Sequence, residues 1–267
     1  MTVNYFKNPS IPLLGKVPEY LPHDARKLAY RLLSPSVDRG AKALEREMAS
    51  FIRTRSIFVH IPKAAGISIA QSLYEDSACF HVTSSWYSLA LSRQQIRQFF
   101  VFSIVRNPWD RLHSAYHFLQ NGGFNEGDRY LWDRYLKKYK DFRDFVMDLP
   151  NAKFALANIV HLYPMHHFIE LRQGRNILSY FGYYEDLPRA YSHIAAHVSG
   201  GANLQHHNKN NLKKRSYQSS YNDKMIDVVG GIYGRDISLF GYTFDSFDRG
   251  RAQIKLGHRM QAFPQAF

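Results

Sequence analysis

The chain has 267 residues, of which 45% are hydrophobic and 21% are charged, so it can bury a sizeable core and bulk disorder is excluded. Its formal net charge of +13 points to an anionic partner, such as a nucleotide, an acidic polysaccharide, a membrane surface or nucleic acid. Cys79 is the only cysteine, which rules out an intrachain disulfide and a thiolate metal cluster and fits a reducing compartment.

Residues 1–22 carry four prolines and no hydrophobic periodicity, which predicts an arm on the surface. Two amphipathic helices are expected next. Asp24 caps the first of them, and Leu44, Met48 and Phe51 fall at helical spacing in the second. The N-terminus has no apolar core of signal-peptide length, and the longest apolar run is far shorter than the ~20 residues of a membrane span. We therefore expect no transmembrane segment and a cytoplasmic protein.

Three apolar runs predict buried β-strands: residues 56–61, residues 99–105 and, more weakly, residues 179–184. A helix is expected from about Ser68 after the first run and from Pro108 after the second. Strands that alternate with helices predict an α/β fold with a doubly wound, mostly parallel sheet flanked by helices. The ligands of such a sheet bind at the carboxyl ends of its strands.

The remaining segments predict helical embellishments at the N-terminus and in the middle of the chain. Residues 120–150 have a helical, aromatic and charged pattern after a flexible Asn-Gly-Gly. Residues 199–223 are polar and predict a long loop, which inside a domain is more often functional than idle. Because no linker divides the chain, we expect a single domain over residues 1–267.

The first chemical motif is HIPKAAGISIAQSL, residues 60–73, between a predicted strand and a predicted helix. Backbone N–H groups at such a junction point toward a bound anion, Lys63 adds a mobile cation, and Gly66 allows close approach. The motif is P-loop-like but is not a Walker A sequence, because its lysine precedes its glycine. The alternative is a helix-capping turn with a lysine on the surface.

The second motif is FSIVRNPWDRLHSAYHFL, residues 102–119. Arg106 follows the end of a predicted strand, where an NTPase would place an Asp that holds Mg²⁺. Ser114 lies eight residues later, so it can share one side of the following helix with Arg106. An Arg and a Ser hydroxyl make a phosphate clamp. The alternative is a structural Arg106 paired with Asp110.

Together, IPKAAGISI and VRNPWDRLHSAY resemble the sulfotransferases that use 3′-phosphoadenosine 5′-phosphosulfate (PAPS), a family with carbohydrate-directed, heparan-type and bacterial members. The resemblance implies that Arg106 and Ser114 hold the 3′-phosphate. This sequence departs from the family's usual motif at Ala65 and Ile67, where threonines are common. The change removes side-chain hydroxyls but no backbone donors. The resemblance also implies that the 5′-phosphosulfate lies on a loop formed by Lys63, Ala64, Ala65, Gly66, Ile67 and Ser68.

Later segments extend the likeness over residues 56–245 as a family core, with residues 1–55 as the N-terminal arm and helices and residues 246–267 as a C-terminal tail. A basic loop within residues 205–221 is expected to close over the nucleotide. The alternative for any one of its cations is a solvated charge. The candidate phosphate contacts are Lys209, Lys213, Lys214 and Arg215.

The resemblance also implies a catalytic base. The segment FHVTSSW, residues 80–86, is similar to the family's His-x-Thr block, which makes His81 the candidate. A base with a pKa near neutrality contributes roughly 10²–10⁴ in rate. His60 and His113 are the competing candidates. No metal is expected, because the paired histidines lack an HExxH arrangement.

The function implied is transfer of a sulfonate group from PAPS to an acceptor hydroxyl by in-line displacement without a metal, with Lys63 stabilising the leaving oxygen and adenosine 3′,5′-bisphosphate (PAP) as product. A P-loop kinase or NTPase is the first alternative, and a non-catalytic binder of anionic polymer is the second. Nucleic acid is disfavoured as the partner, because no recognition signature surrounds the basic runs.

The motif spelling is closer to the carbohydrate-directed branch, so we expect a saccharide or glycoconjugate acceptor. Aromatic side chains with neighbouring cations suit sugar rings that bear acidic groups. Tyr135, Tyr139 and Phe142 have the spacing of one buried helix face and are assigned to the core. The residues assigned to an acceptor cleft are Trp86, Tyr87, Tyr130 and Trp132.

Overall fold

The three apolar runs form one parallel sheet in the computed structural model, which describes residues 48–74, 81–171, 176–198 and 216–250. All six residues of the central strand are buried, as expected for a parallel strand that is covered on both faces. The three predicted strands are therefore confirmed. In their order in the sheet, they are β1 (Ser56–Phe58), β2 (Phe100–Val105) and β3 (Tyr180–Tyr183).

The register brings the carboxyl ends of the three strands to the same edge of the sheet. Phe102 of β2 pairs with Tyr180 of β3, and Phe58 of β1 pairs with Phe102 on the other side. Ser103 is the one polar residue of β2, and its buried hydroxyl donates to the Val59 carbonyl at 2.7 Å. This bond satisfies the polar atom inside the core and ties the segment after β1 to β2.

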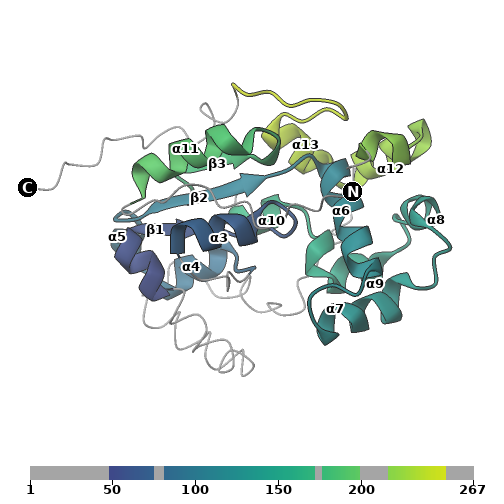
Figure 1. Ribbon diagram of the computed structural model, residues 1–267, viewed down its shortest axis with the longest axis horizontal. Coiled ribbons are helices and arrows are strands. Elements are labelled where there is room, and N and C mark those ends of the chain that lie inside the picture. The colour runs from purple at the N-terminus through teal and green to yellow at the C-terminus, as the bar shows by residue number, and fades with distance from the viewer. Residues whose placement is uncertain (1–47, 75–80, 172–175, 199–215, 251–267) are drawn as a thin grey trace, which may run out of the picture.

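Helices cover both faces of the sheet (Figure 1). Helices α3 (Gly66–Tyr74) and α4 (Ser84–Ala90) lie on one side, and α11 (Leu187–His197) lies on the other, where it packs on β2 and β3. Apolar residues of α3, α11 and the sheet share one hydrophobic core. The helical segments that complete this half are residues 48–54, α5 (Arg93–Ile96) and α10 (His166–Ile169).

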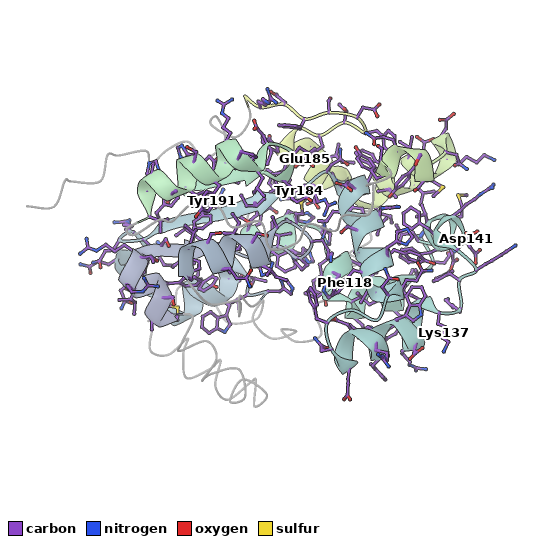
Figure 2. The ribbon with its side chains drawn as sticks, in the orientation of Figure 1. Phe118, Lys137, Asp141, Tyr184, Glu185 and Tyr191 are labelled. Atoms are coloured by element: carbon purple, nitrogen blue, oxygen red, sulfur yellow. The ribbon has the colours of Figure 1, made fainter. Side chains whose placement is uncertain are left out.

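A second group of helices lies beyond the carboxyl ends of the strands, around α6 (Pro108–Gln120), and has its own core (Figure 1). Phe118 of α6, labelled in Figure 2, lies where this group meets the sheet half. The other segments of the group are α7 (Glu126–Leu131), the π-helix η2 (Trp132–Leu136), α8 (Phe142–Met147), α9 (Lys153–Asn158) and α12 (Asp223–Ile232). Short 3₁₀ turns and a last helix connect the parts: η3 (Val160–Leu162), η5 (Tyr184–Asp186), η6 (Tyr217–Ser220) and α13 (Gly234–Phe240).

Buried polar bonds join the two halves. Asp236 of α13 is fully buried, and its carboxylate accepts the backbone N–H groups of Met165 and His166 at 2.6 and 2.9 Å. Arg111 of α6 is also buried and donates to the carbonyls of His161 and Tyr163 at 3.2 and 2.5 Å. These bonds hold residues 161–166, the segment between the two cores, in one position.

The prediction of one buried helix face through Tyr135, Tyr139 and Phe142 is wrong. The π-helix η2 ends at Leu136, Tyr139 lies in the turn that follows, and Phe142 begins α8. The helix breaks because the Asp141 side chain accepts the Asp144 N–H at 2.8 Å and so caps a new helix. Tyr139 and Phe142 are nevertheless buried, in agreement with their assignment to the core.

The predicted helix starts agree with the structure to within two residues. The helix expected from about Ser68 begins at Gly66, and Pro108 occupies the first turn of α6 as predicted. Part of the predicted loop 199–223 is structured, because η6 and the start of α12 fall within it. The N-terminal arm, Asp24 and Leu44 lie outside the described residues.

The structure is an α/β fold with a three-stranded parallel sheet flanked by helices. Its described strands follow one another in sequence order, so the doubly wound topology, the P-loop-like character and the single domain stay predictions. No helix in the described parts of the chain is long and apolar enough to cross a membrane.

Helix α3, which follows β1, begins at Gly66, where the His60 ring leaves no room for a side chain. A Cβ on Gly66 would lie 1.6 Å from Nε2 of the buried His60 ring. We therefore expect Gly66→Ala to lower the free energy of unfolding by about 1–3 kcal/mol, as overpacking does. Gly231→Ala in α12 is the control, because no atom lies within 4 Å of the added Cβ and alanine favours a helix by about 1 kcal/mol. Urea unfolding of both variants checks this, and equal stabilities would contradict it.

Candidate functional site

The loop between β1 and α3 carries unused backbone donors. Lys63 and Ala65 have left-handed φ values of 67° and 62°, which cost a residue with a side chain about 1–2 kcal/mol each. Within the described chain, the backbone N–H groups of residues 63–68 make no hydrogen bond. Free donors in left-handed turns before a helix N-terminus form a concavity that suits an anion. The loop predicted to be a cradle thus has the donors that a cradle requires.

Lys63 extends from this loop toward the second helix group. Its Nζ lies 3.7 Å from the centroid of the Phe118 ring, a cation–π contact. Burial and then repulsion from Arg106 lower the pKa of Lys63 to about 8, and the Asp128 carboxylate partly opposes this shift. The ammonium is therefore poorly compensated by the protein, and a bound anion would stabilise it strongly.

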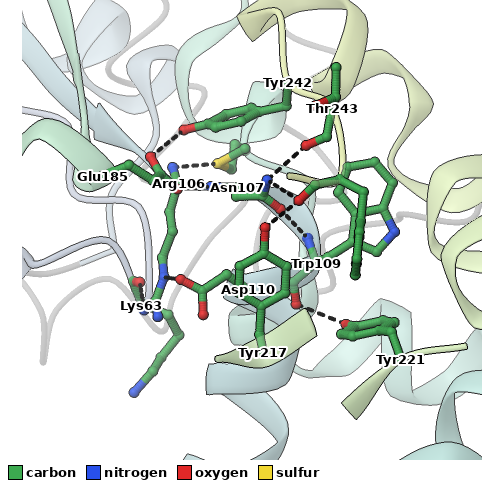
Figure 3. A network of polar contacts seen from close by, with 12 residues as sticks. Lys63, Arg106, Asn107, Trp109, Asp110, Glu185, Tyr217, Tyr221, Tyr242 and Thr243 are labelled. Carbon is green, nitrogen blue, oxygen red and sulfur yellow. Dashed lines mark hydrogen bonds and ion pairs between the residues drawn. The ribbon is translucent and has the colours of Figure 1, made fainter. Parts of the chain in front are cut away.

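Arg106 connects the end of β2 to the cradle (Figure 3). Its Nη1 donates to the Lys63 carbonyl at 2.8 Å, and its Nε donates to the Asp110 carboxylate at 2.8 Å. The guanidinium also stacks on the Tyr184 ring at 4.1 Å. Burial opposes the charge, but the Asp110 carboxylate outweighs it and raises the pKa of Arg106. Arg106 is thus a permanent cation that also fixes the shape of the loop.

The structure therefore contains the Arg106–Asp110 pair expected if Arg106 has a structural role. Arg106 also contacts the predicted cradle. Ser114 is half-buried on α6, four residues after Asp110 and so on the same face of that helix. No hydrogen bond joins Ser114 to Arg106 among the described residues. A phosphate contact by these two side chains stays a prediction.

A polar network surrounds a pocket beside Arg106 (Figure 3). Asn107 donates its backbone N–H to Glu185 at 2.6 Å and its side-chain N–H to the Thr243 carbonyl at 2.9 Å. The Tyr242 hydroxyl donates to the same Glu185 carboxylate at 3.1 Å, and burial raises the pKa of Glu185. The pocket has a volume of about 630 Å³ and is lined by Asn107, Glu185, Tyr217, Gln218, Asp245, Ser246, Phe247, Asp248, Arg249 and Gly250.

Three histidines gather next to the cradle. The ring centroids of His60 and His81 are 4.3 Å apart, and those of His81 and His161 are 5.7 Å apart. The His81 Nδ1 lies 3.3 Å from the His60 carbonyl, and because a carbonyl only accepts, Nδ1 carries the proton of this bond. The Nε2 lone pair of a neutral His81 is then left for an incoming proton.

The pKa of His81 is lowered well below its usual value, first by burial and then by His60 and His161. Burial likewise lowers the pKa of His161 to about 3, with Lys63 contributing next. All three rings are near the predicted cradle, but His113 is elsewhere. Its Nε2 lies 3.1 Å from the Ser220 hydroxyl of η6, and its ring packs on Phe142.

Sequence reasoning missed His161 as a member of this site. It lies a hundred residues after His60 in the chain, in a short 3₁₀ turn with no motif around it. The buried Arg111, which donates to the His161 carbonyl, helps to hold it there. Asp128, whose charge acts on Lys63, was missed for the same reason, because the Asn-Gly-Gly turn folds it back.

The paired histidines that raised the question of a metal site contact other parts of the protein. His166 binds Asp236 at 2.7 Å, and the rings of His193 and His197 pack against Tyr180 and Phe100 of the sheet. A cluster of three or more potential metal ligands is absent from the part of the chain that the structure describes. The candidate contacts that lie outside the described residues are Lys209, Lys213, Lys214 and Arg215.

The predicted acceptor aromatics do not share one cleft. Tyr87 is fully buried and packs near Phe51, with ring centroids 6.1 Å apart, so its assignment to a cleft is wrong. Neighbouring residues on a helix point about 100° apart, which is why Trp86 stays half-exposed while Tyr87 enters the core. Trp132 packs on Tyr116 of α6, and Tyr130 is 61% exposed.

The comparisons with known proteins agree with the motifs. A family model described as the sulfotransferase family matches residues 54–243, which is more than half of the chain. The chain therefore belongs to the sulfotransferase family, and this membership supports sulfonate transfer as its general activity. Searches of curated proteins and of solved structures found no match.

The environment of Lys63 makes a direct prediction about its protonation. Because burial dominates, Lys63 should titrate near pH 8 rather than near 10.5. Replacing Asp128 by Asn removes a charge that favours the ammonium, so the pKa should fall further in Asp128→Asn. NMR titration of labelled lysine, with Lys63→Arg used for the assignment, measures both values. A wild-type Lys63 that titrates above pH 10 would contradict this description of the loop.

Proposed function

We propose that this chain transfers a sulfonate group from PAPS to a hydroxyl of a saccharide acceptor. The observation that carries the proposal is the row of free backbone donors at residues 63–68, held by Arg106 and completed by Lys63. Membership of the sulfotransferase family supports the reaction type. The donor is the one that the family resemblance implies, and the saccharide acceptor is the one that the motif spelling favours.

The free donors suit the 5′-phosphosulfate. Backbone N–H groups from Lys63, Ala64, Ala65, Gly66, Ile67 and Ser68 would donate hydrogen bonds to its oxygens, which explains why Ala65 and Ile67 can replace the threonines common in the family. Arg106, with Ser114 on the same side, would bind the 3′-phosphate. Lys209, Lys214 and Arg215 are proposed as further phosphate contacts.

The pocket beside Arg106 suits the nucleoside. Its volume of about 630 Å³ is typical of a small-molecule site. Tyr217 and Phe247 offer rings on which a purine can stack, and Glu185 and Asp245 offer acceptors for amino and hydroxyl groups. Carboxylates repel phosphates, so the base and ribose rather than the phosphates fit this pocket.

In the chemical step that we propose, Lys63 and His81 act on the two oxygens that leave and attack sulfur. A bond forms between the acceptor oxygen and sulfur while the bond between sulfur and the 5′-phosphate oxygen breaks. Lys63 stabilises the charge on that leaving oxygen, and the loop N–H groups hold the sulfonate. His81 takes the hydroxyl proton on Nε2. The negative donor would raise the low pKa of His81 toward neutrality, where a base is most effective.

The alternative functions are less well supported. A P-loop kinase or NTPase needs an acidic residue for Mg²⁺ at the end of the second strand, and Arg106 occupies that position. A non-catalytic binder of anionic polymer would need exposed cations, whereas Lys63 and Arg106 are largely buried. We therefore propose a direct, metal-free transfer. We also propose that the chain forms a single domain and that the protein is cytoplasmic.

Nucleotide binding gives the first test of this function. PAP should raise the melting temperature in the presence of a chelator, and adenosine 5′-monophosphate should raise it much less. A charge-assisted contact to the 3′-phosphate is worth about 1.5–3 kcal/mol, which corresponds to roughly 10- to 150-fold in affinity. Thermal-shift titration measures the difference. Equal stabilisation by the two nucleotides would refute the assignment of Arg106 and Ser114.

The pH dependence of kcat/KM gives the second test. The reaction requires a cationic Lys63, whose charge is lost as pH rises through about 8, so kcat/KM should fall on the alkaline side of pH 8. With PAPS as the varied substrate, kcat/KM reports the free enzyme, which also requires a neutral His81, so kcat/KM should persist well below pH 6.5 before it falls.

Two variants separate the alkaline limb of the pH profile, assigned to Lys63, from the acid limb, assigned to His81. Lys63→Arg should move the alkaline limb to higher pH, because an arginine keeps its charge. His81→Ala should lose roughly 10²–10⁴-fold in rate and also lose the acid limb, with PAP binding retained. If His81→Ala turned over like the wild type, the base would have to be another residue.

A further inference from the structure

An exposed aromatic ring stands beside the proposed site. Phe124 is 70% exposed, although most side chains of its size are buried. Its ring contacts Phe118 edge-on, with centroids 4.9 Å apart, and Phe118 lies directly under the Lys63 ammonium. Phe118 also packs near the His161 ring, with centroids 5.1 Å apart. A continuous row of rings thus leads from solvent to Lys63 and the histidine cluster.

The turn that carries Phe124 is built to hold it there. Gly122 and Gly123 have φ values of 88° and 64°, and the Gly123 N–H donates to the Phe118 carbonyl at 2.9 Å. The buried Asp128 carboxylate accepts the Phe124 N–H at 2.9 Å. A side chain on Gly123 would meet Asp128 at 2.1 Å, so the turn tolerates no larger residue there. Phe124 is therefore a fixed ring on the surface.

Stability does not explain this position. A side chain that is 70% exposed buries little apolar area, and the protein has another such ring in Phe154 of α9, which is 79% exposed. Phe124 and Phe154 differ in their surroundings, because Phe124 contacts the Phe118 ring on which the Lys63 ammonium lies. This position makes Phe124 a candidate for contact with the second substrate.

We propose that Phe124 is the acceptor-binding platform of the enzyme and that a sugar ring packs on its exposed face while presenting a hydroxyl toward Lys63 and His81. This inference rests on the proposed function and names the residue that selects the acceptor. One face of a pyranose ring is lined with C–H groups and its rim carries hydroxyls, so it pairs with a single open aromatic face flanked by polar groups. The exposed Asn125 and Arg129 provide those polar groups.

The charge of the chain supports a sugar with acidic groups. Arg129 follows the turn on α7, and its guanidinium lies beside Gly122. A carboxylate on the sugar would pair with it at the edge of the platform. A small phenol or steroid acceptor needs apolar walls on both faces, which one ring with 70% of its surface in solvent does not provide.

The test compares Phe124→Ala with Phe154→Ala, a matched removal of an exposed ring away from the turn. Sulfonate transfer from PAPS is measured on a panel of neutral oligosaccharides, uronic-acid-containing oligosaccharides and simple phenols, and KM is determined for the oligosaccharide with the highest turnover. Phe124→Ala should raise that KM about tenfold, the usual effect of removing a contact aromatic, with kcat changed little. Phe124→Trp should restore binding, and Phe154→Ala should match the wild type.

Thermal stabilisation by PAP is measured for each variant and should be unchanged, because no contact to the nucleotide is removed. If the wild type transfers sulfonate to a saccharide and Phe124→Ala has the KM of the wild type, the platform is refuted and the proposed function stands. If the wild type binds PAP but uses only phenols, both the saccharide acceptor and the platform are refuted. If PAP does not bind at all, the proposed function itself fails.

Discussion

The bond between the Arg106 guanidinium and the Lys63 carbonyl is the contact on which the site depends. Its length is 2.8 Å, and it joins the end of β2 to the loop after β1. Asp110 orients the same guanidinium from α6, and Tyr184 stacks on it from the end of β3. One buried cation thus sets the positions of three strand ends and holds the loop in left-handed conformations. This arrangement costs stability but leaves the loop N–H groups free for a ligand.

Desolvation gives the site its chemical properties. Burial lowers the pKa of Lys63, of His81 and of His161, while the carboxylate of Asp110 keeps Arg106 charged. The protein therefore gathers positive charge in a place where it cannot fully compensate that charge itself. A bound anion would supply the missing compensation, and under the proposed function this anion is the phosphosulfate of PAPS. The neutral His81 can then accept a proton on Nε2.

The local parts of this description were readable from the sequence. The apolar runs predicted the strands, and motif spelling predicted a cradle at Lys63 and a cation at Arg106, because these features depend on neighbouring residues. Long-range placement was not readable. His161 and Asp128 reach the site through Arg111 and the Asn-Gly-Gly turn, and Tyr87 enters the core because α4 turns that face inward. The proposed role of Phe124 in acceptor binding could be inferred only from its contact with Phe118 in the structure.

The most direct measurement is transfer of sulfur label from PAPS to an oligosaccharide in the presence of a chelator, with wild type and Lys63→Ala compared side by side. We expect label on the saccharide with the wild type and a strong loss of transfer with Lys63→Ala. Thermal-shift titration should show PAP binding retained in the variant, since the main work of Lys63 lies in the transition state. Transfer that is unchanged in Lys63→Ala, or a wild type that transfers no label without added Mg²⁺, would contradict the proposed function.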